Sequence, residues 1–183
     1  ETGEPYIVNI DNCNDALPQG QKDLGLEVKQ SNLCSEITLP TNDERTAVCC
    51  LSSVNLEHFD EWSKDDKFID DLVTMLDNVL EHFIENAVDL NSLGGYNANF
   101  ERFKKHIKEG KEGFTKAAYS AYRERSIGLG AMGFHSYLQN QNVPFEGIFS
   151  TGINYRLFKF IKGAAVSASR RLAELRGEAP DIS

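Results

Sequence analysis

The sequence predicts a mixed α/β fold whose first third is rich in strands and whose remainder is helical. Two observations support this prediction. The short segments Tyr6–Ile10, Glu27–Leu39 and Thr46–Val54 are β-prone or alternate in polarity. From Phe68 to Ala87, apolar residues recur with helical spacing. At 183 residues the chain fits one domain. We expect residues 1–183 to form a single partial domain, with strands and loops over 1–54 and mainly helices over 55–183.

The predicted strands lie between turn-forming residues. Tyr6–Ile10 ends in a polar cluster typical of turns, which favours a buried strand. Glu27–Leu39 is expected to be a second strand or an extended loop, closed by the turn that begins at Pro40. Thr46–Val54 is a further short apolar run. Two extended segments joined by a tight connection could place Cys34 and Cys49 side by side.

The helical part begins with an amphipathic pattern. Ser63 followed by Asp66 resembles a capping box, and the apolar stripe that ends at Ala87 predicts one helix. His82 within this stripe is interpreted as structural or exposed. The charged run Glu101–Lys116 is typical of a solvated helical face. Three later segments are also predicted to be helical: Ala117–Arg125, Met132–Gln141 and Asn154–Arg176.

Composition excludes several classes of function. The formal net charge of −9 disfavours non-specific binding to nucleic acid or to an anionic membrane. No stretch approaches the roughly 18 apolar residues that span a bilayer. The first residues, Glu1–Pro5, form neither a basic nor an apolar targeting region. We therefore expect a cytoplasmic protein with small-molecule or protein partners.

The four cysteines are expected to be intracellular thiols. The chain is too long and too rich in apolar residues to need disulfides for stability. It contains no Cys-x-x-Cys pair, and its histidines show no ligand spacing with the cysteines, so no metal site is predicted.

The candidate reactive site is the segment that contains Asn32, Cys34 and Glu36. These residues occupy every second position, so an extended backbone would direct an amide, a thiol and a carboxylate to one side. A thiol can exchange a hydrogen atom, a carboxylate can accept a proton and an amide can hold a hydroxyl group. The pattern predicts that the three side chains face one small substrate.

The segment Gly128–Gly133 matches the dinucleotide-binding pattern G-x-G-x-x-G. That pattern functions between a buried strand and a helix in a β-α-β unit, whereas the residues before Gly128 are polar and helix-prone. We interpret the glycines as permitting close backbone approach where a helix packs under a sheet. A non-enzymatic nucleotide-binding or interaction module built around this segment is the alternative function.

Together these motifs resemble the central part of the large (α) subunit of class I ribonucleotide reductase. The resemblance is carried in order by Asn32–Ile37, Ala47–Leu51 and Arg125–Gly130, and Tyr6–Asn14 is similar to the segment that precedes the radical cysteine. It implies that the chain is part of the ten-stranded α/β barrel of that family. The segment Asn91–Tyr122 is interpreted as a subgroup insertion.

The resemblance also implies a role for each candidate residue. Cys34 would carry the transient thiyl radical that abstracts the 3'-hydrogen of a ribonucleoside diphosphate. Glu36 would accept the 3'-hydroxyl proton, and Asn32 would hold the ribose hydroxyls. Cys49 would be one of two reducing thiols, whereas Cys50 is expected to point the opposite way and to pack. Cys13 is treated as structural.

The family further implies partners that this chain does not contain. No cofactor is expected in the chain, and the radical would come from a separate metal-containing small subunit. The remaining large-subunit polypeptide and thioredoxin or glutaredoxin would complete the enzyme. Because class I large subunits are several times longer, we interpret the chain as a split-gene product, an intein-separated piece or an excised piece, inactive by itself.

Two further alternatives remain open on the sequence. An adenosylcobalamin-dependent reductase uses the same thiyl chemistry, so these residues do not separate it from class I. The pair Cys49-Cys50 could instead form a thiol redox switch, which the pKa and reactivity of each thiol would test.

Overall fold

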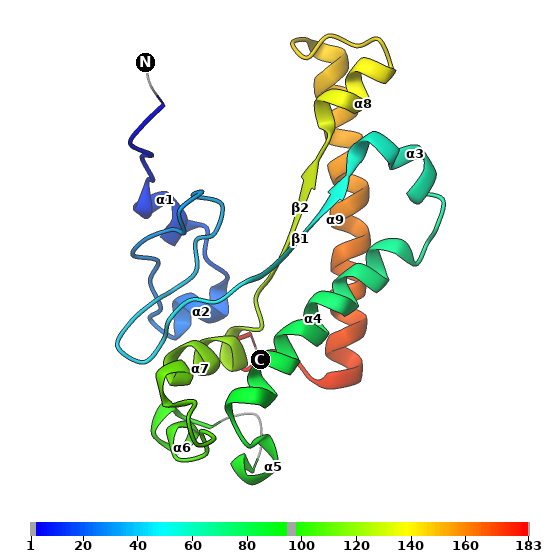
Figure 1. Ribbon diagram of the computed structural model, residues 1–183. Coiled ribbons are helices and arrows are strands. Elements are labelled where there is room, and N and C mark those ends of the chain that lie inside the picture. Colours follow the sequence, from blue (N-terminus) through cyan, green and yellow to red (C-terminus); the bar gives the residue numbers. More distant parts are fainter. Residues whose placement is uncertain (1–2, 95–97, 183) are drawn as a thin grey trace. The chain divides into compact units, whose positions relative to one another are not determined.

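The computed structural model describes residues 3–94 and 98–182 (Figure 1). The chain divides into two compact units. Unit 1 consists of Glu1–Cys49, Leu80–Ser126 and Glu178–Ser183, and unit 2 consists of Cys50–Val79 and Ile127–Gly177. The candidate residues Asn32, Cys34, Glu36 and Cys49 therefore all belong to unit 1.

Unit 2 is built on two parallel strands, β1 (Cys50–Asn55) and β2 (Ile127–Met132). Their register pairs Cys50 with Ile127 and Asn55 with Met132. Figure 1 shows the strands side by side with the long helix α9 (Ile148–Arg176) beside them. The buried core joins β1, the first part of α4 (Phe68–Ala87), α8 (Phe134–Asn140) and α9. The buried residues of this core are Val54, Leu56, Phe59, Ile69, Val73, Tyr137, Leu157, Ile161, Ala168 and Leu172.

Polar contacts fix the connection that follows β1. Asn55 caps the short 3-10 helix η1 (Leu56–His58), because its side chain accepts a hydrogen bond from the Glu57 N–H at 3.1 Å. Helix α3 (Phe59–Trp62) follows, and the indole of Trp62 donates to the Asn55 carbonyl at 2.8 Å. This arrangement allows Phe59 to enter the core of unit 2.

Unit 1 contains short helices connected by irregular segments. They are α1 (Ile10–Asp15), α2 (Gln19–Asp23), α5 (Leu90–Leu93), α6 (Phe100–Lys104), η2 (Glu112–Phe114) and α7 (Thr115–Glu124). Helix α7 is the best buried of these, and Tyr119 and Tyr122 on it pack against Phe103 with ring centroids 5.2 Å apart in both pairs. The last part of α4 adds Leu80 and Ile84 to the buried residues of this unit.

The predicted α/β class is confirmed, but the strand expected over Tyr6–Ile10 is wrong. Tyr6 and Ile7 are 61% and 87% exposed, and Ile10 begins helix α1 instead of ending a strand. The reason is Asn14, whose side chain accepts from the Val28 N–H at 2.8 Å and donates to the Val28 carbonyl at 3.1 Å. The polar cluster therefore joins two segments rather than closing a strand.

Of the two alternatives expected for Glu27–Leu39, a strand or an extended loop, the structure shows the loop, with a tight turn over its central residues. The third expectation is confirmed in part, because β1 begins only at Cys50. Before that point the Thr46 N–H donates to the Lys116 carbonyl at 3.3 Å, so this end of the segment bonds to helix α7 and not to a strand.

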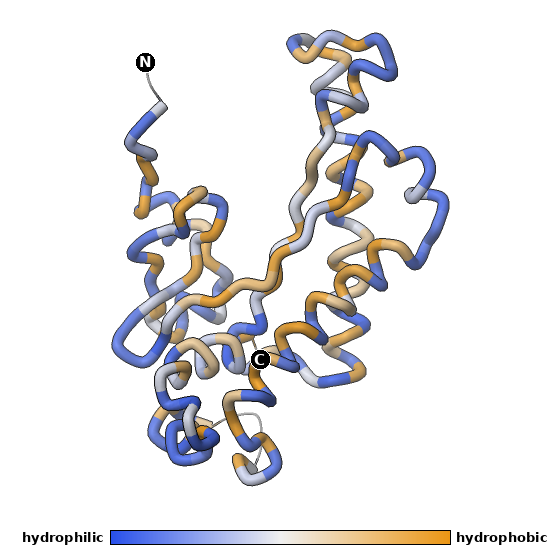
Figure 2. Tube along the Cα trace, viewed as in Figure 1, coloured by the Kyte–Doolittle hydropathy of each residue, from blue (hydrophilic) through white to orange (hydrophobic). Residues whose placement is uncertain are grey.

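The main helices are where the periodicity predicts them, with shifted ends. Helix α4 begins at Phe68, because Ser63 is the C-cap of α3 and the Asp65 carboxylate accepts from the Lys67 N–H at 2.9 Å. His82 is exposed, as expected, and its side chain bonds to Asn86. Figure 2 shows hydrophobic and hydrophilic residues alternating around α4.

The later helices match their predicted segments to different degrees. Helix α7 agrees closely, α8 begins at Phe134, and α9 begins at Ile148, earlier than Asn154. The charged run Glu101–Lys116 is helical only in parts. In the described part of the chain, no helix combines the length and the apolar character needed to cross a membrane.

The prediction of one partial domain with an insertion over Asn91–Tyr122 stays a prediction. Within that stretch, Gly94 ends α5 with a left-handed backbone conformation at φ 72°, which a glycine adopts without steric cost. Residues 95–97 lie outside the described residues.

Candidate functional site

The candidate site loop, Ser31–Ile37, is a tight turn held by the side chain and backbone of Asn32. The Asn32 N–H donates to the Ile37 carbonyl at 3.3 Å, and the Ser35 N–H donates to the Asn32 carbonyl at 3.1 Å. The Asn32 side-chain oxygen also accepts from the Ile37 N–H at 3.0 Å. These bonds hold Ser35 at φ 65°, in the left-handed region that residues with a side chain rarely adopt.

The same turn joins two of the three predicted side chains directly. The amide nitrogen of Asn32 donates to one carboxylate oxygen of Glu36 at 2.6 Å. Cys34 lies between them at the exposed tip of the turn. The prediction that an extended strand presents all three side chains is therefore wrong, because the Asn32 backbone bonds bend the chain. Asn32 and Glu36 nevertheless meet through this turn.

Cys34 borders an open cavity of about 470 Å³. The segment Gly3–Ile7 lines the cavity together with Cys34 and Ser35. This volume lies within the range of small-molecule sites, which runs from about 300 to 1,000 Å³. The thiol is therefore accessible from a space that could hold a small ligand.

Cys49 and Cys50 differ in their surroundings. Along β1, Cys50 shares a face with Ser52 and the buried Val54, and burial raises the pKa of the Cys50 thiol. This agrees with a packing role, because a raised pKa disfavours the reactive thiolate. Cys49 precedes the strand and is half-buried. The hydrogen bonds given above for the site loop join Asn32 to Ser35, Glu36 and Ile37.

The glycine motif does not form a phosphate-binding loop. Gly128 and Gly130 lie within strand β2, and only Gly133 stands at the start of a helix, α8. An added Cβ at Gly130 would lie 2.9 Å from the Ser53 hydroxyl on β1. Gly130 therefore leaves room for a side chain of the paired strand, and not for a helix packed under a sheet.

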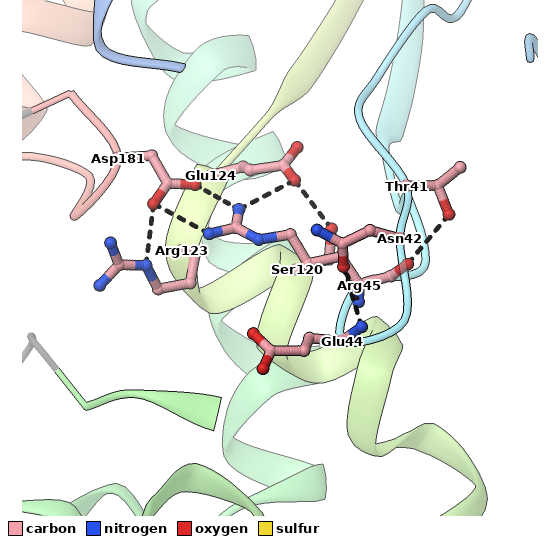
Figure 3. Close-up of polar contacts among 8 residues, drawn as sticks. All are labelled: Thr41, Asn42, Glu44, Arg45, Ser120, Arg123, Glu124 and Asp181. Carbon is pink, nitrogen blue, oxygen red and sulfur yellow. Dashed lines mark hydrogen bonds and ion pairs between the residues drawn. The ribbon is translucent and has the colours of Figure 1, made fainter. Parts of the chain in front are cut away.

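Sequence reasoning missed a buried ionic cluster in unit 1, shown in Figure 3, which consists of Arg45, Ser120, Arg123, Glu124 and Asp181. The Arg45 guanidinium donates to both carboxylate oxygens of Asp181 and to Glu124 at 3.3 Å. Arg123 donates to Asp181 at 2.8 Å, and Ser120 donates to Glu124 at 3.0 Å. No local pattern marks this cluster, because Arg45 and Asp181 are far in the sequence from each other and from helix α7, which carries the other three residues.

Burial has the largest effect on the pKa of Glu124 in this cluster. It raises the pKa of Glu124 above its ordinary value, although the hydrogen bond from Ser120 and the charge of Arg45 act in the opposite direction. One oxygen of Glu124, Oε2, is buried without a hydrogen-bond partner among the described residues. Asp181 instead has both oxygens paired, so it is the main anion that holds Arg45.

Comparison with known proteins identifies the family. The chain matches the family model described as "Ribonucleotide reductase, barrel domain" over residues 1–182. The chain belongs to the ribonucleotide reductase family. Members of this family include the ribonucleoside-diphosphate reductase large subunit of Invertebrate iridescent virus 3, which is 47% identical over 99% of this chain. The corresponding subunit of Trypanosoma brucei brucei is 31% identical over 97% of the chain.

A solved structure agrees with this assignment. The Actinobacillus ureae class Id ribonucleotide reductase alpha subunit matches 99% of the chain with a TM-score of 0.81 and 34% sequence identity. The chain spans only part of these reductases, namely 25% of the viral subunit and 31% of the Actinobacillus chain. Residues 1–182 therefore correspond to part of a barrel domain, and Cys34 is exposed within this part.

Proposed function

We propose that this chain supplies the radical-cysteine part of a ribonucleoside-diphosphate reductase large subunit. The observation that carries the proposal is the Asn32–Glu36 hydrogen bond, which fixes a carboxylate on the turn that exposes the Cys34 thiol. The family match over residues 1–182 supports it independently. In this interpretation the cavity beside Cys34 contributes to the ribose site.

The first step needs a hydrogen-atom acceptor and a base on the same side of the ribose. A thiyl radical at Cys34 abstracts the hydrogen atom from C3', forming an S–H bond and leaving a carbon radical. Glu36 accepts the proton of the 3'-hydroxyl. Asn32 orients the hydroxyl groups and holds Glu36 within reach. The short turn thus keeps the base close to the thiol without a separate element to position it.

The second step needs two electrons. Cys49 and a thiol from the remaining large subunit together supply two electrons and two protons. One proton leaves with the 2'-hydroxyl as water, a hydrogen takes its place at C2', and the two sulfurs join as a disulfide. Glu36 returns its proton to the 3'-oxygen. Cys34 then returns its hydrogen atom to C3', which regenerates the thiyl radical. Thioredoxin or glutaredoxin would reduce the disulfide for the next turnover, in the cytoplasm.

The complete enzyme requires polypeptide beyond this segment. The remaining large subunit completes the barrel, and a metal-containing small subunit generates the radical. The formal net charge of −9 disfavours a nucleic-acid partner.

The test uses the complete large subunit that contains this segment, combined with its small subunit. Cys34→Ala is expected to abolish nucleotide reduction, because it removes the only atom proposed to carry the radical. Cys13→Ala is the matched control, since Cys13 is a half-buried thiol on α1 and should leave turnover unchanged. Turnover by the Cys34→Ala enzyme would refute the proposal.

A further inference from the structure

The connection between the Cys34 turn and Cys49 is fixed at one point, Arg45. The Arg45 N–H donates to the Asn42 side chain at 2.9 Å, and the Arg45 carbonyl accepts from the Thr41 hydroxyl at 2.9 Å and from the Asn42 N–H at 3.1 Å. The next residue, Thr46, bonds to helix α7 through the Lys116 carbonyl. The backbone here is therefore held before the chain reaches the reducing cysteine.

The Arg45 side chain ties this backbone to two other parts of unit 1. Arg45 is only 6% exposed and its guanidinium binds Asp181 and Glu124, as Figure 3 shows. It also stacks over the Tyr119 ring, 5.5 Å from the ring centroid. Asp181 is in turn fixed to α7, because its N–H donates to the Arg123 carbonyl at 3.1 Å. Planar, bidentate binding of this kind defines both position and orientation.

The anchor is close enough to Cys49 to control it. Only Thr46, Ala47 and Val48 separate Arg45 from Cys49. Even a fully extended chain would span at most about 14 Å over that stretch. A shift of the Arg45 backbone would therefore also displace Cys49, because the three residues between them are too few to compensate for the shift. The buried salt bridge also resists any such shift, because moving Arg45 would leave Asp181 buried without its main partner.

We propose that Arg45 is a positioning residue for the reducing thiol Cys49, and that it acts through its buried contacts with Asp181 and Glu124. The proposal rests on the proposed function, because it assigns Arg45 to the step in which Cys49 donates electrons. Arg45 does not touch the substrate in this view. It sets where the Cys49 sulfur stands relative to the turn that carries Cys34.

The experiment is a single turnover of the complete enzyme with the external reductant withheld. Under these conditions product formation depends on the thiol pair that contains Cys49. The rate constant and the amount of product per active site are measured, together with oxidation of Cys49 by alkylation and mass spectrometry. Arg45→Met should slow the reaction by about 10²-fold, the loss expected from misplacing a reacting group by about 1 Å. The amount of product per folded enzyme and the KM for substrate should change much less.

Two conservative variants keep the test valid if Arg45→Met does not fold. Arg45→Lys retains the charge but not the bidentate geometry, so it should restore only part of the rate. Asp181→Asn removes the main anion while preserving side-chain shape, and it should slow the same step. Wild-type rate constants in both variants would overturn the proposal.

Arg171→Met is the matched control in unit 2. Arg171 binds the Asp70 carboxylate through two hydrogen bonds of 2.8 and 2.7 Å, so its loss also removes a bidentate ion pair. The rate constant of Arg171→Met should equal that of the wild type. If Arg171→Met slows the reaction as much as Arg45→Met does, the Arg45 effect is general destabilisation. The Cys34→Ala enzyme separates the two ideas, because its inactivity supports the proposed function whatever the Arg45 variants do.

Discussion

Replacing Asn32 with aspartate tests the turn chemistry with almost no change of shape. The aspartate can still accept from the Ile37 N–H, whereas the donor that meets Glu36 at 2.6 Å becomes a second carboxylate oxygen. The backbone bonds from Asn32 to Ile37 and from Ser35 to Asn32 remain available in the variant. The perturbation is therefore confined to the contact between residue 32 and Glu36.

The loss of activity expected for Asn32→Asp follows from two contributions. Loss of a hydrogen bond to a charged group costs about 1.5–3 kcal/mol, and solvent exposure places this one at or below the lower end of that range. Repulsion between two carboxylates about 3 Å apart adds about 1 kcal/mol in water. A total of about 2 kcal/mol corresponds to a loss of about 30-fold in kcat/KM when the Glu36 orientation limits the reaction.

The assay compares Asn32→Asp with Asn32→Ala in the complete reductase at two ionic strengths. Both variants lose the hydrogen bond, but only the aspartate adds repulsion, so it should be the slower enzyme. Added salt should recover part of its activity and leave the alanine variant unchanged, because exposed charges are screened. An aspartate variant within twofold of the wild type would refute the reasoning.

Two further predictions concern Glu124 and the glycine motif. Burial raises the folded pKa of Glu124 above its ordinary 4.5, so the stability of the wild type falls as the pH rises from 4.5 through the folded pKa. Glu124→Gln has no carboxyl group to titrate and should not lose this stability. Hydrogen exchange of the α7 amides should therefore show the variant gaining protection relative to the wild type between acid and neutral pH. Gly133→Ala should destabilise unit 2 by about 1–3 kcal/mol, because Gly133 has φ 77° and a Cβ there would overlap the Asn55 side chain. Gly163→Ala, in open space on α9, should be neutral or stabilising in the same exchange measurement, and equal effects at Gly133 and Gly163 would contradict this account.

Local patterns in the sequence determined much of this protein. The apolar periodicity between Phe68 and Ala87 defines helix α4, because one helix face repeats at short spacing. The order of the Asn32–Glu36 element and the later cysteines indicates the reductase family, and comparison over residues 1–182 confirms it. These features depend on residues that are neighbours in the chain, which is why they could be recognised before the fold was known.

The structure decided how those residues meet, through local hydrogen bonds in the turn and through contacts between distant segments. The alternation at Asn32, Cys34 and Glu36 suggested an extended strand, but backbone bonds from Asn32 to Ile37 bend it into a turn. The Arg45–Asp181 anchor joins residues 136 positions apart, and no short-range pattern encodes such a contact. A buried charge gains its partner only when distant segments pack together. The buried ion pairs that hold the segment before Cys49 in place therefore form only in the folded unit and are not encoded in its local sequence.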